Sequence, residues 1–315
     1  MTQTISCPAP AKLNLFLHVV GRRPDGYHLL QTLFRFIDLH DTLHFTLRKD
    51  GAVRRTNIIE GVAEEQDLCV RAARLLQSET GCLLGVDIAV EKQIPMGGGL
   101  GGGSSDAATT LIALNRLWSL GLPRARLMQL GLRLGADVPV FVFGENAFAE
   151  GVGEELQAYS LPEAWYVVLF PPVQVPTAQI FAHPELTRDT VSITMRALSE
   201  RQLRHVTDEV SRLREQLPSR SSRTKGLRPT VLERQLQLRN DLQSVVCKLY
   251  PEVARYLAWL DNSGKAMMTG SGACVFAEFA SRSQAEAVLR QLPHDMRGVV
   301  TQGLAQHPLR DWVLD

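Results

Sequence analysis

One segment of the sequence concentrates glycines just ahead of a run of helix-forming residues. From Gly97 to Gly103, six of the seven residues are glycine, and Ser104, Ser105 and Asp106 follow. Glycine costs backbone entropy and has no side chain to bury, so such a cluster is typical of backbone that approaches something closely. Free N–H groups at a helix N-terminus favour anions, and the segment therefore predicts a phosphate-binding loop. A flexible surface turn is the alternative interpretation.

Three familiar nucleotide-binding motifs fit this loop poorly. A P-loop requires a lysine directly after its glycines, and none follows here. Gly97, Gly99 and Gly102 match the spacing of the dinucleotide fingerprint. That fingerprint also needs an acid about 20 residues later, however, and the next acid after Asp106 is Asp137. The His-Arg-Asp and Asp-Phe-Gly motifs of protein kinases do not occur in the sequence.

Two charged residues stand in apolar runs, where a charge is costly unless it is paired. Asp137 lies in Gly-Ala-Asp-Val-Pro-Val-Phe, and a carboxylate there can accept the proton of an alcohol nucleophile. Lys12 lies in Ala-Lys-Leu-Asn-Leu, and its natural partners are Asp137 and a transferred phosphate. A helix-end aspartate and a lysine reaching solvent from a strand edge are the alternatives. Asn14 shares the strand face of Lys12, as a substrate contact or a satisfied core residue.

Four segments, taken in order along the chain, resemble motifs of the GHMP small-molecule kinases. They are residues 8–17 together with 24–28, residues 95–107, residues 135–141 and residues 269–276. The resemblance implies an α+β fold of two lobes with ATP and the substrate between them. It further implies an N-terminal lobe like the second domain of ribosomal protein S5 and a ferredoxin-like C-terminal lobe.

The first segment and the long glycine motif are similar to one branch of these kinases. That branch phosphorylates the 2-hydroxyl of a methylerythritol linked to cytidine diphosphate, in the non-mevalonate route to isoprenoid precursors. The resemblance therefore implies an ATP-dependent kinase with this small-molecule substrate. A GHMP kinase for another small alcohol is the alternative within the superfamily, and a nucleotide-binding regulator without catalysis is the alternative from another class.

The resemblance also implies roles for individual residues. Asp137 would be the catalytic base, and Lys12 would keep it ionised and stabilise the transition state. Residues expected to bind ATP are Pro95, Met96, Gly97, Gly98, Gly99, Leu100, Gly101, Gly102, Gly103, Ser104 and Ser105. Residues expected to bind the substrate are Asn14, Tyr27, His28, Thr177 and Phe181, with Tyr27 and Phe181 stacking on cytosine and His28 hydrogen-bonding it. Mg²⁺ is expected to arrive with ATP, without dedicated protein ligands.

The surrounding pattern indicates which elements position these residues. Strands are predicted at residues 13–20, 29–37, 42–47, 86–90, 166–170, 274–279 and 299–300. Helices are predicted from near Asp67, from Ala107 to Trp118 with Ser104 or Ser105 as N-cap, and at 127–134, 253–260 and 285–292. We place a domain boundary near residue 158, which separates an ATP-binding catalytic domain, residues 1–158, from a C-terminal domain, residues 159–315. A basic segment near 200–239 is expected to be a solvated helix and a mobile loop.

Composition narrows the class of protein. The 315 residues suggest about two domains, and 34 basic against 33 acidic residues give a net charge of +1. Such a balance provides no global field for nucleic acid or an anionic membrane. No stretch reaches the ~20 apolar residues of a membrane span, and the N-terminus lacks the pattern of a signal peptide. Five scattered cysteines suit a reducing cytoplasm. We expect a cytoplasmic monomer or weak homodimer.

Overall fold

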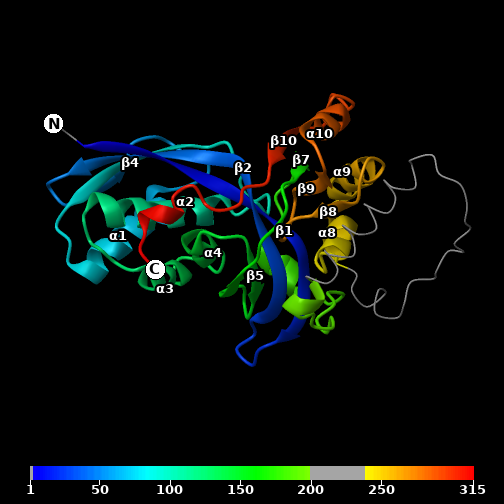
Figure 1. Ribbon diagram of the computed structural model, residues 1–315, viewed down its shortest axis with the longest axis horizontal. Helices are drawn as coiled ribbons and strands as arrows, with labels where there is room; N and C mark the ends of the chain where they lie inside the picture. Colours follow the sequence, from blue (N-terminus) through cyan, green and yellow to red (C-terminus); the bar gives the residue numbers. More distant parts are fainter. Residues whose placement is uncertain (1–2, 199–237) are drawn as a thin grey trace, which may run out of the picture.

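The computed structural model describes residues 3–198 and 238–315 and contains two β-sheets flanked by helices (Figure 1). Within these ranges the first sheet consists of β1 (Thr4–Arg22), β2 (His28–Arg48), β3 (Val53–Arg55), β4 (Gly85–Glu91), β5 (Ala147–Glu150) and β6 (Glu155–Ala158). The second sheet consists of β7 (Trp165–Leu169), β8 (Ala266–Met268), β9 (Val275–Phe279) and β10 (Gly298–Gln302). The predicted α+β class is confirmed.

Helices cover both sheets. They are α1 (Leu68–Thr80), α2 (Gly102–Leu117), α3 (Arg124–Leu132), α4 (Val138–Phe143), α5 (Thr177–Ala182), α8 (Gln243–Leu249), α9 (Pro251–Asp261) and α10 (Arg282–Leu289), with short 3₁₀ turns at Glu64–Gln66 and Arg310–Trp312. Every helix predicted in the described ranges is present, with ends shifted by a few residues. In the described part of the chain, no helix combines the length and the apolar character needed to cross a membrane. All but the last two residues of the basic segment 200–239 lie outside the described residues.

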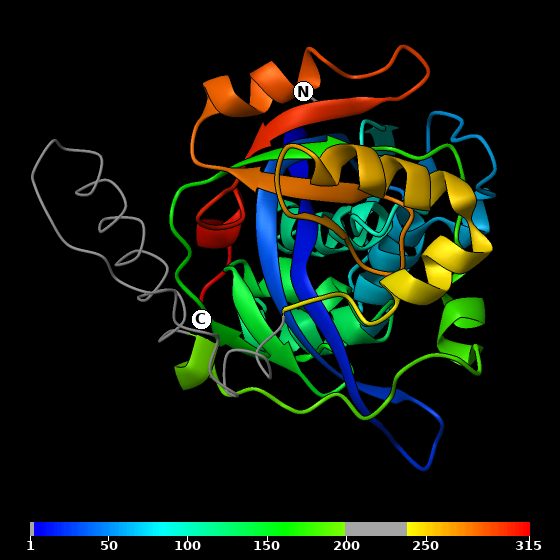
Figure 2. The same ribbon diagram turned by 90° about the vertical axis from the view of Figure 1, so that its right-hand side faces the viewer.

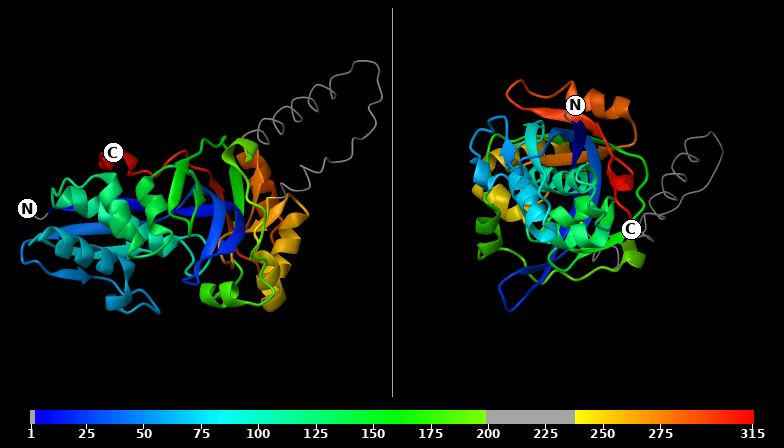
Figure 3. Two further views of the ribbon diagram at one scale, coloured as in Figure 1. Left: turned by 90° about the horizontal axis from the view of Figure 1, so that it is seen from below. Right: turned by 90° about the vertical axis from the view of Figure 1, so that its left-hand side faces the viewer.

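The two larger hydrophobic cores among the described residues belong to the two sheets. The first lies between the first sheet and α1 to α4, and α2 is buried along most of its length. The second lies between the second sheet and α8, α9 and α10, the helices that connect its strands. Figures 2 and 3 show α9 and α10 against the second sheet, at the end of the molecule away from α1. The long β1–β2 ribbon extends from one end toward the other and connects the two halves.

The antiparallel β1–β2 pair positions the charged residue of the first motif. Lys12 and Asn14 lie two residues apart on β1 and therefore share one face of the sheet. The register shifts between Pro10 and Ala11 and again after Asn14. Such irregularities bend a strand and redirect its side chains, and they often lie beside functional sites.

Two strands that are predicted separately form one continuous strand in the structure. Residues 29–37 and 42–47 both belong to β2, which is continuous from His28 to Arg48. The shift between Pro10 and Ala11 leaves residues 38 and 39 of β2 without partners. Because a bulge changes the phase of the inward and outward alternation, the sequence pattern looked like two segments.

The N-cap predicted for the helix after the glycines is wrong. Gly101, with φ of +75°, is the N-cap of α2, so Ser104 and Ser105 lie inside its first turns. Glycine adopts this left-handed conformation without strain, which lets the helix begin three or four residues earlier than predicted. No side chain caps this helix, so its first N–H groups remain available to a ligand.

The end of the chain returns to the first core. Leu309 and Val313 are buried there, and the N–H of Arg124 in α3 donates to the carbonyl of Leu314 at 2.9 Å. The first sheet ends at Ala158 and the second begins at Trp165. The domain limits at residues 1–158 and 159–315 remain a prediction, since the last residues pack on the first half.

Candidate active site

A cavity of about 1130 Å³ lies where β1, β2, the glycine loop and α5 meet. Sites for one small ligand are typically about 300–1,000 Å³, so this cavity lies just above the upper end of that range. The predicted site residues that line it are Lys12, Asn14, Tyr27, His28, Pro95, Met96, Gly97, Gly98, Gly99, Leu100, Gly101, Gly102, Gly103, Ser104, Asp137, Thr177 and Phe181. Ser105 does not line it. That residue is buried in α2, and its Oγ has no hydrogen-bond partner among the described residues.

Three successive carbonyl groups of the glycine loop, residues 95–103, accept hydrogen bonds from other parts of the chain. Gly98 O accepts a hydrogen bond from the Cys274 N–H at 3.1 Å. Leu100 O accepts from the Lys12 N–H at 2.9 Å, and Gly99 O accepts from Lys12 Nζ at 3.1 Å. In a trans peptide group the N–H points opposite to the C=O. The amides that follow these carbonyls therefore point away from the protein donors, as binding of an anion in the cavity requires.

Gly99 is the loop position with the least room for a side chain. Its φ is +75°, and an added Cβ would lie 2.2 Å from the carbonyl oxygen of Thr269. We expect Gly99→Ala to lower the free energy of unfolding by roughly 2–4 kcal/mol, because left-handed backbone and overpacking are both costly. Urea unfolding measures this.

Gly103→Ala is the matched control for that variant. Gly103 lies in the first turn of α2, and an added Cβ would meet Leu68 at an ordinary 3.4 Å. Alanine there should leave the free energy of unfolding unchanged or raise it by roughly 0.5–1 kcal/mol. Equal stability of the Gly99 and Gly103 variants would contradict the steric argument.

Lys12 and Asp137 form an ion pair in the cavity. Nζ lies 3.4 Å from Oδ2, and the Lys12 side chain is only 2 % exposed, whereas that of Asp137 is 39 % exposed. Burial strengthens the field of the ammonium, and exposure leaves the carboxylate accessible to a substrate. Asp137 directly precedes α4, but its side chain makes no capping hydrogen bond. The predicted pairing is therefore present, and the catalytic roles of the two residues remain predictions.

Buried polar atoms hold the Lys12 ammonium in place. Nζ donates to Asn14 Oδ1 at 2.6 Å, and it lies 5.4 Å from the centre of the Phe34 ring. The Asn14 amide nitrogen in turn donates to Thr32 Oγ1 at 2.9 Å. Asn14 thus orients Lys12 with both ends of its amide engaged, which is what a satisfied core asparagine does. Its contact with a substrate remains a prediction.

Aromatic side chains line the cavity at the β1–β2 turn and α5. Tyr27 is 64 % exposed, and the Phe181 ring lies 5.0 Å from the ring of His28 with 35° between their planes. Thr177 Oγ1 lies 2.7 Å from Ser271 Oγ in the last of the four motifs. The structure therefore brings the predicted base-binding residues together. An exposed aromatic face beside a polar imidazole suits a flat heterocycle.

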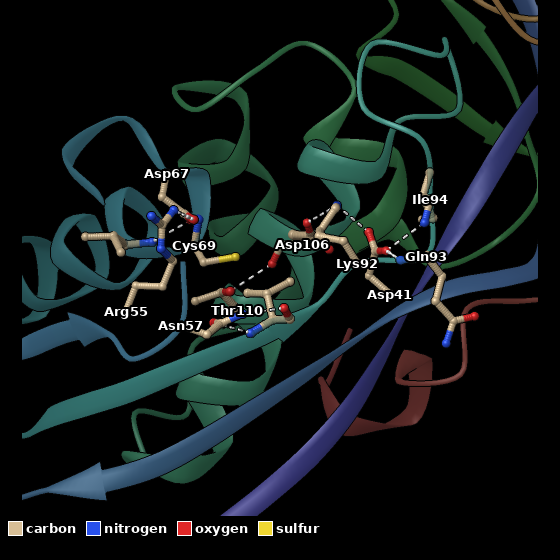
Figure 4. A network of polar contacts seen from close by, with 12 residues as sticks. Asp41, Arg55, Asn57, Asp67, Cys69, Lys92, Gln93, Ile94, Asp106 and Thr110 are labelled. Carbon is tan, nitrogen blue, oxygen red and sulfur yellow. Dashed lines mark hydrogen bonds and ion pairs between the residues drawn. The ribbon is translucent and has the colours of Figure 1, made fainter. Parts of the chain in front are cut away.

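Lys92 connects the two ends of the glycine loop, as Figure 4 shows. Its ammonium contacts Asp41 and, at 2.8 Å, Asp106 Oδ2 in α2. Asp41 is fully buried and also accepts hydrogen bonds from the N–H groups of Gln93 and Ile94, at 2.6 and 2.8 Å. One ammonium thus joins β2, the chain entering the loop and the helix leaving it.

The carboxyl group of Asp106 titrates unusually late. Burial raises the pKa of Asp106 from 3.8 to about 7, opposed by Lys92 and reinforced by Asp41. The folded protein therefore keeps a proton that the unfolded chain releases near pH 4, so its stability falls as pH rises toward 7. Relative to Asp106→Asn, the wild-type free energy of unfolding should fall by roughly 1 kcal/mol per pH unit between about pH 5 and 7. Urea unfolding of both proteins without nucleotide measures this, and parallel pH curves would contradict it.

Sequence reasoning missed Asp41, Lys92 and Arg188, of which Lys92 and Arg188 line the cavity. Lys92 stands in a Glu-Lys-Gln run and Arg188 in Thr-Arg-Asp, and both patterns are typical of solvated surface. Their importance lies in distant partners, since Asp41 is 51 residues from Lys92. A second buried pair in Figure 4, Arg55 with Asp67 at 2.8 Å, anchors the start of α1 in the same way.

Comparisons with known proteins agree with the fold. The profile of the GHMP kinases N terminal domain matches residues 67–145, and that of the GHMP kinases C terminal domain matches residues 225–298. The chain is 55 % identical over 311 residues to the 4-diphosphocytidyl-2-C-methyl-D-erythritol kinase of Nitrosospira multiformis, covering 98 % of this chain and 94 % of that one. It is 56 % identical over 306 residues to the kinase of the same name from Thiobacillus denitrificans, covering 97 % and 98 %.

Solved structures extend this similarity. A crystal structure of 4-(cytidine 5'-diphospho)-2C-methyl-D-erythritol kinase matches with a TM-score of 0.74 and 32 % identity, covering 95 % of this chain and all of that one. The Methanococcus jannaschii mevalonate kinase matches with a TM-score of 0.60 at 15 % identity, which shows a shared fold. The predicted two-lobed GHMP kinase fold is confirmed. The chain belongs to the GHMP kinases and, within them, to the family of the 4-diphosphocytidyl-2-C-methyl-D-erythritol kinases.

Proposed function

We propose that the protein transfers the γ-phosphoryl group of ATP to the 2-hydroxyl of 4-diphosphocytidyl-2-C-methyl-D-erythritol, giving the 2-phosphate and ADP. This step belongs to the non-mevalonate route to isoprenoid precursors. The observation that carries the proposal is the identity of about 55 % to kinases of that name over nearly the whole chain. The geometry supports it, because one cavity holds the glycine loop, the Lys12–Asp137 pair and the aromatic residues around His28.

The side chains divide the chemistry between them. Asp137 accepts the proton of the 2-hydroxyl as its oxygen attacks the γ-phosphorus. The bond between that phosphorus and the β,γ-bridging oxygen breaks, and the bridging oxygen leaves with ADP. Lys12 lies between this carboxylate and the glycine loop, bound to Asp137 Oδ2 and Gly99 O. Its buried charge stabilises the negative charge on the transferred group. The amides of the loop hold the ADP phosphates as they leave.

Mg²⁺ carried by ATP fits the residues present. Its chemistry would be to neutralise the nucleotide phosphates. Ser104 lines the cavity at the start of α2 and offers a hydroxyl oxygen, the type of donor that Mg²⁺ accepts. Among the described residues, no group of three or more His, Cys, Asp and Glu side chains is arranged as a metal site.

Three further proposals concern the cellular compartment, the oligomeric state and the partners of the protein. We infer a reducing cytoplasm from the five described cysteines, all of which are free thiols. A monomer or weak homodimer is the proposed state. Neither nucleic acid nor a membrane is a proposed partner, in line with the near-neutral charge.

A coupled assay of ADP formation tests the proposed function. With Mg²⁺ and ATP, the cytidine-linked substrate is expected to support turnover well above that with mevalonate, homoserine or galactose, the alcohols of other GHMP kinases. Equal or faster turnover with one of these alcohols would favour a different small-molecule kinase. Nucleotide binding without phosphoryl transfer to any alcohol would overturn the proposal.

A further inference from the structure

Arg188 contacts a predicted substrate-binding residue, and no step of the mechanism above uses it. Its Nε donates a hydrogen bond to His28 Nε2 at 3.1 Å, and both side chains line the cavity. The rest of the guanidinium is held by the end of α5 and the chain after it. Nη1 donates to Leu186 O at 3.0 Å, and Nη2 donates to Phe181 O at 2.9 Å and to His183 O at 2.8 Å. Backbone carbonyls therefore fix the direction of the Nε–H independently of the imidazole.

This contact determines which nitrogen of His28 carries the proton. Arginine stays charged and only donates hydrogen bonds, so the nitrogen that faces it must be an unprotonated acceptor. A neutral imidazole that accepts at Nε2 carries its hydrogen on Nδ1. In an imidazolium, the Nε2–H of His28 would face the Nε–H of Arg188, and neither could accept a hydrogen bond from the other. In agreement, burial lowers the pKa of His28, and the nearby charges of Arg188 and Arg22 lower it further.

We propose that Arg188 holds His28 as the neutral Nδ1–H tautomer, so that His28 donates a hydrogen bond to N3 of the cytosine ring. Cytosine N3 is an acceptor, whereas uracil carries a hydrogen at that position and would meet the Nδ1–H donor to donor. Arg188 is then a positioning residue that sets base specificity without touching the base. The choice of cytosine rests on the proposed function, but the tautomer does not.

The surroundings of His28 leave this donor available to a ligand. No hydrogen bond to Nδ1 is made by any described residue, and the Phe181 ring packs beside the imidazole at 5.0 Å. The same segment thus supplies an aromatic wall, through Phe181, and carbonyls that orient Arg188. The arrangement of residues 181–188 therefore sets both the shape of the base pocket and its hydrogen-bonding pattern.

Nitrogen-15 NMR of the histidine rings in the full-length protein tests the tautomer. In the wild-type protein at neutral pH, without substrate, His28 should show a protonated Nδ1 and an unprotonated Nε2, with His28→Gln used to assign its signals. Arg188→Lys should remove this preference and leave the two tautomers in exchange, since lysine lacks the rigid fork of arginine. Arg22→Lys is the control. Arg22 also raises the positive field at His28 but bonds Gly26 O rather than the ring, so it should leave the tautomer unchanged. A wild-type His28 protonated on Nε2 overturns the proposal, whatever the variants do.

Kinetics with cytidine- and uridine-linked forms of the substrate tests the specificity. The wild-type protein should prefer the cytidine form, and Arg188→Lys should reduce the ratio of the two kcat/KM values by about three- to tenfold, mainly through KM. Circular dichroism establishes that the variant is folded. An unchanged ratio in the folded variant overturns the role of Arg188 in specificity. If neither substrate is phosphorylated while the wild-type spectrum shows the Nδ1–H tautomer, the proposed function fails and the tautomer assignment stands.

Discussion

Replacing Asp137 by asparagine is expected to lower kcat by about 10²–10⁴-fold, because the variant keeps the shape of the side chain but cannot accept a proton. The protein should remain folded. Asp137 makes no capping hydrogen bond at α4, and its side chain is 39 % exposed, so little packing depends on its charge. Steady-state measurement of ADP release with the cytidine-linked substrate gives the rate, and calorimetric titration gives the affinity for substrate.

The pattern of losses distinguishes a base from a binding residue. A base acts in the transition state, so kcat should fall while the dissociation constant of the substrate changes little. Asp38→Asn is the matched control, because Asp38 is an exposed aspartate of β2 that does not line the cavity. That variant should keep the wild-type rate. An Asp137→Asn enzyme within tenfold of the wild-type kcat would remove Asp137 from the mechanism.

Local elements could be predicted because their signals are local. The helix start near Asp67 follows from N-capping chemistry, and its carboxylate does accept from the N–H groups of Cys69 and Val70. Alternating apolar residues likewise gave the position of β4. Two errors have the same origin. The bulge in β2 depends on pairing with β1, and the left-handed Gly101 depends on packing of the glycine loop, so neither leaves a pattern within a short window.

The site residues likewise fall into those with a local sequence signal and those without one. The glycine cluster and the charges in apolar runs are conspicuous because they violate local rules, and such violations concentrate at functional sites. Asp41 and Lys92 obey the local rules, and their pairing appears only when β2 and α2 approach each other across the loop. The return of residues 303–315 to the first core is equally invisible, since Leu309 and Val313 carry ordinary apolar side chains.

Replacing Lys12 by methionine is expected to lower kcat by about 10²–10³-fold. Methionine roughly keeps the buried volume but removes the charge that faces the transferred phosphoryl group, and loss of one preorganised electrostatic donor typically costs this much. It also leaves Asn14 Oδ1 and Gly99 O to share one weaker donor, the Thr269 hydroxyl at 3.4 and 3.3 Å, so stability should fall by about 1–3 kcal/mol. Urea unfolding measures that loss separately, and rates are compared below the unfolding transition.

The double variant Lys12→Met with Asp137→Asn separates two ways in which Lys12 could act. If the ammonium works mainly by orienting and charging the Asp137 carboxylate across their 3.4 Å contact, its removal should cost little once that carboxylate is gone. If it works mainly on the phosphoryl group, the two losses should multiply. Because Nζ also bonds Gly99 O in the glycine loop, we expect a combined loss between these limits, larger than either single loss and smaller than their product. A Lys12→Met enzyme with kcat within threefold of wild type would exclude both modes of action and leave the buried ammonium with a purely structural role.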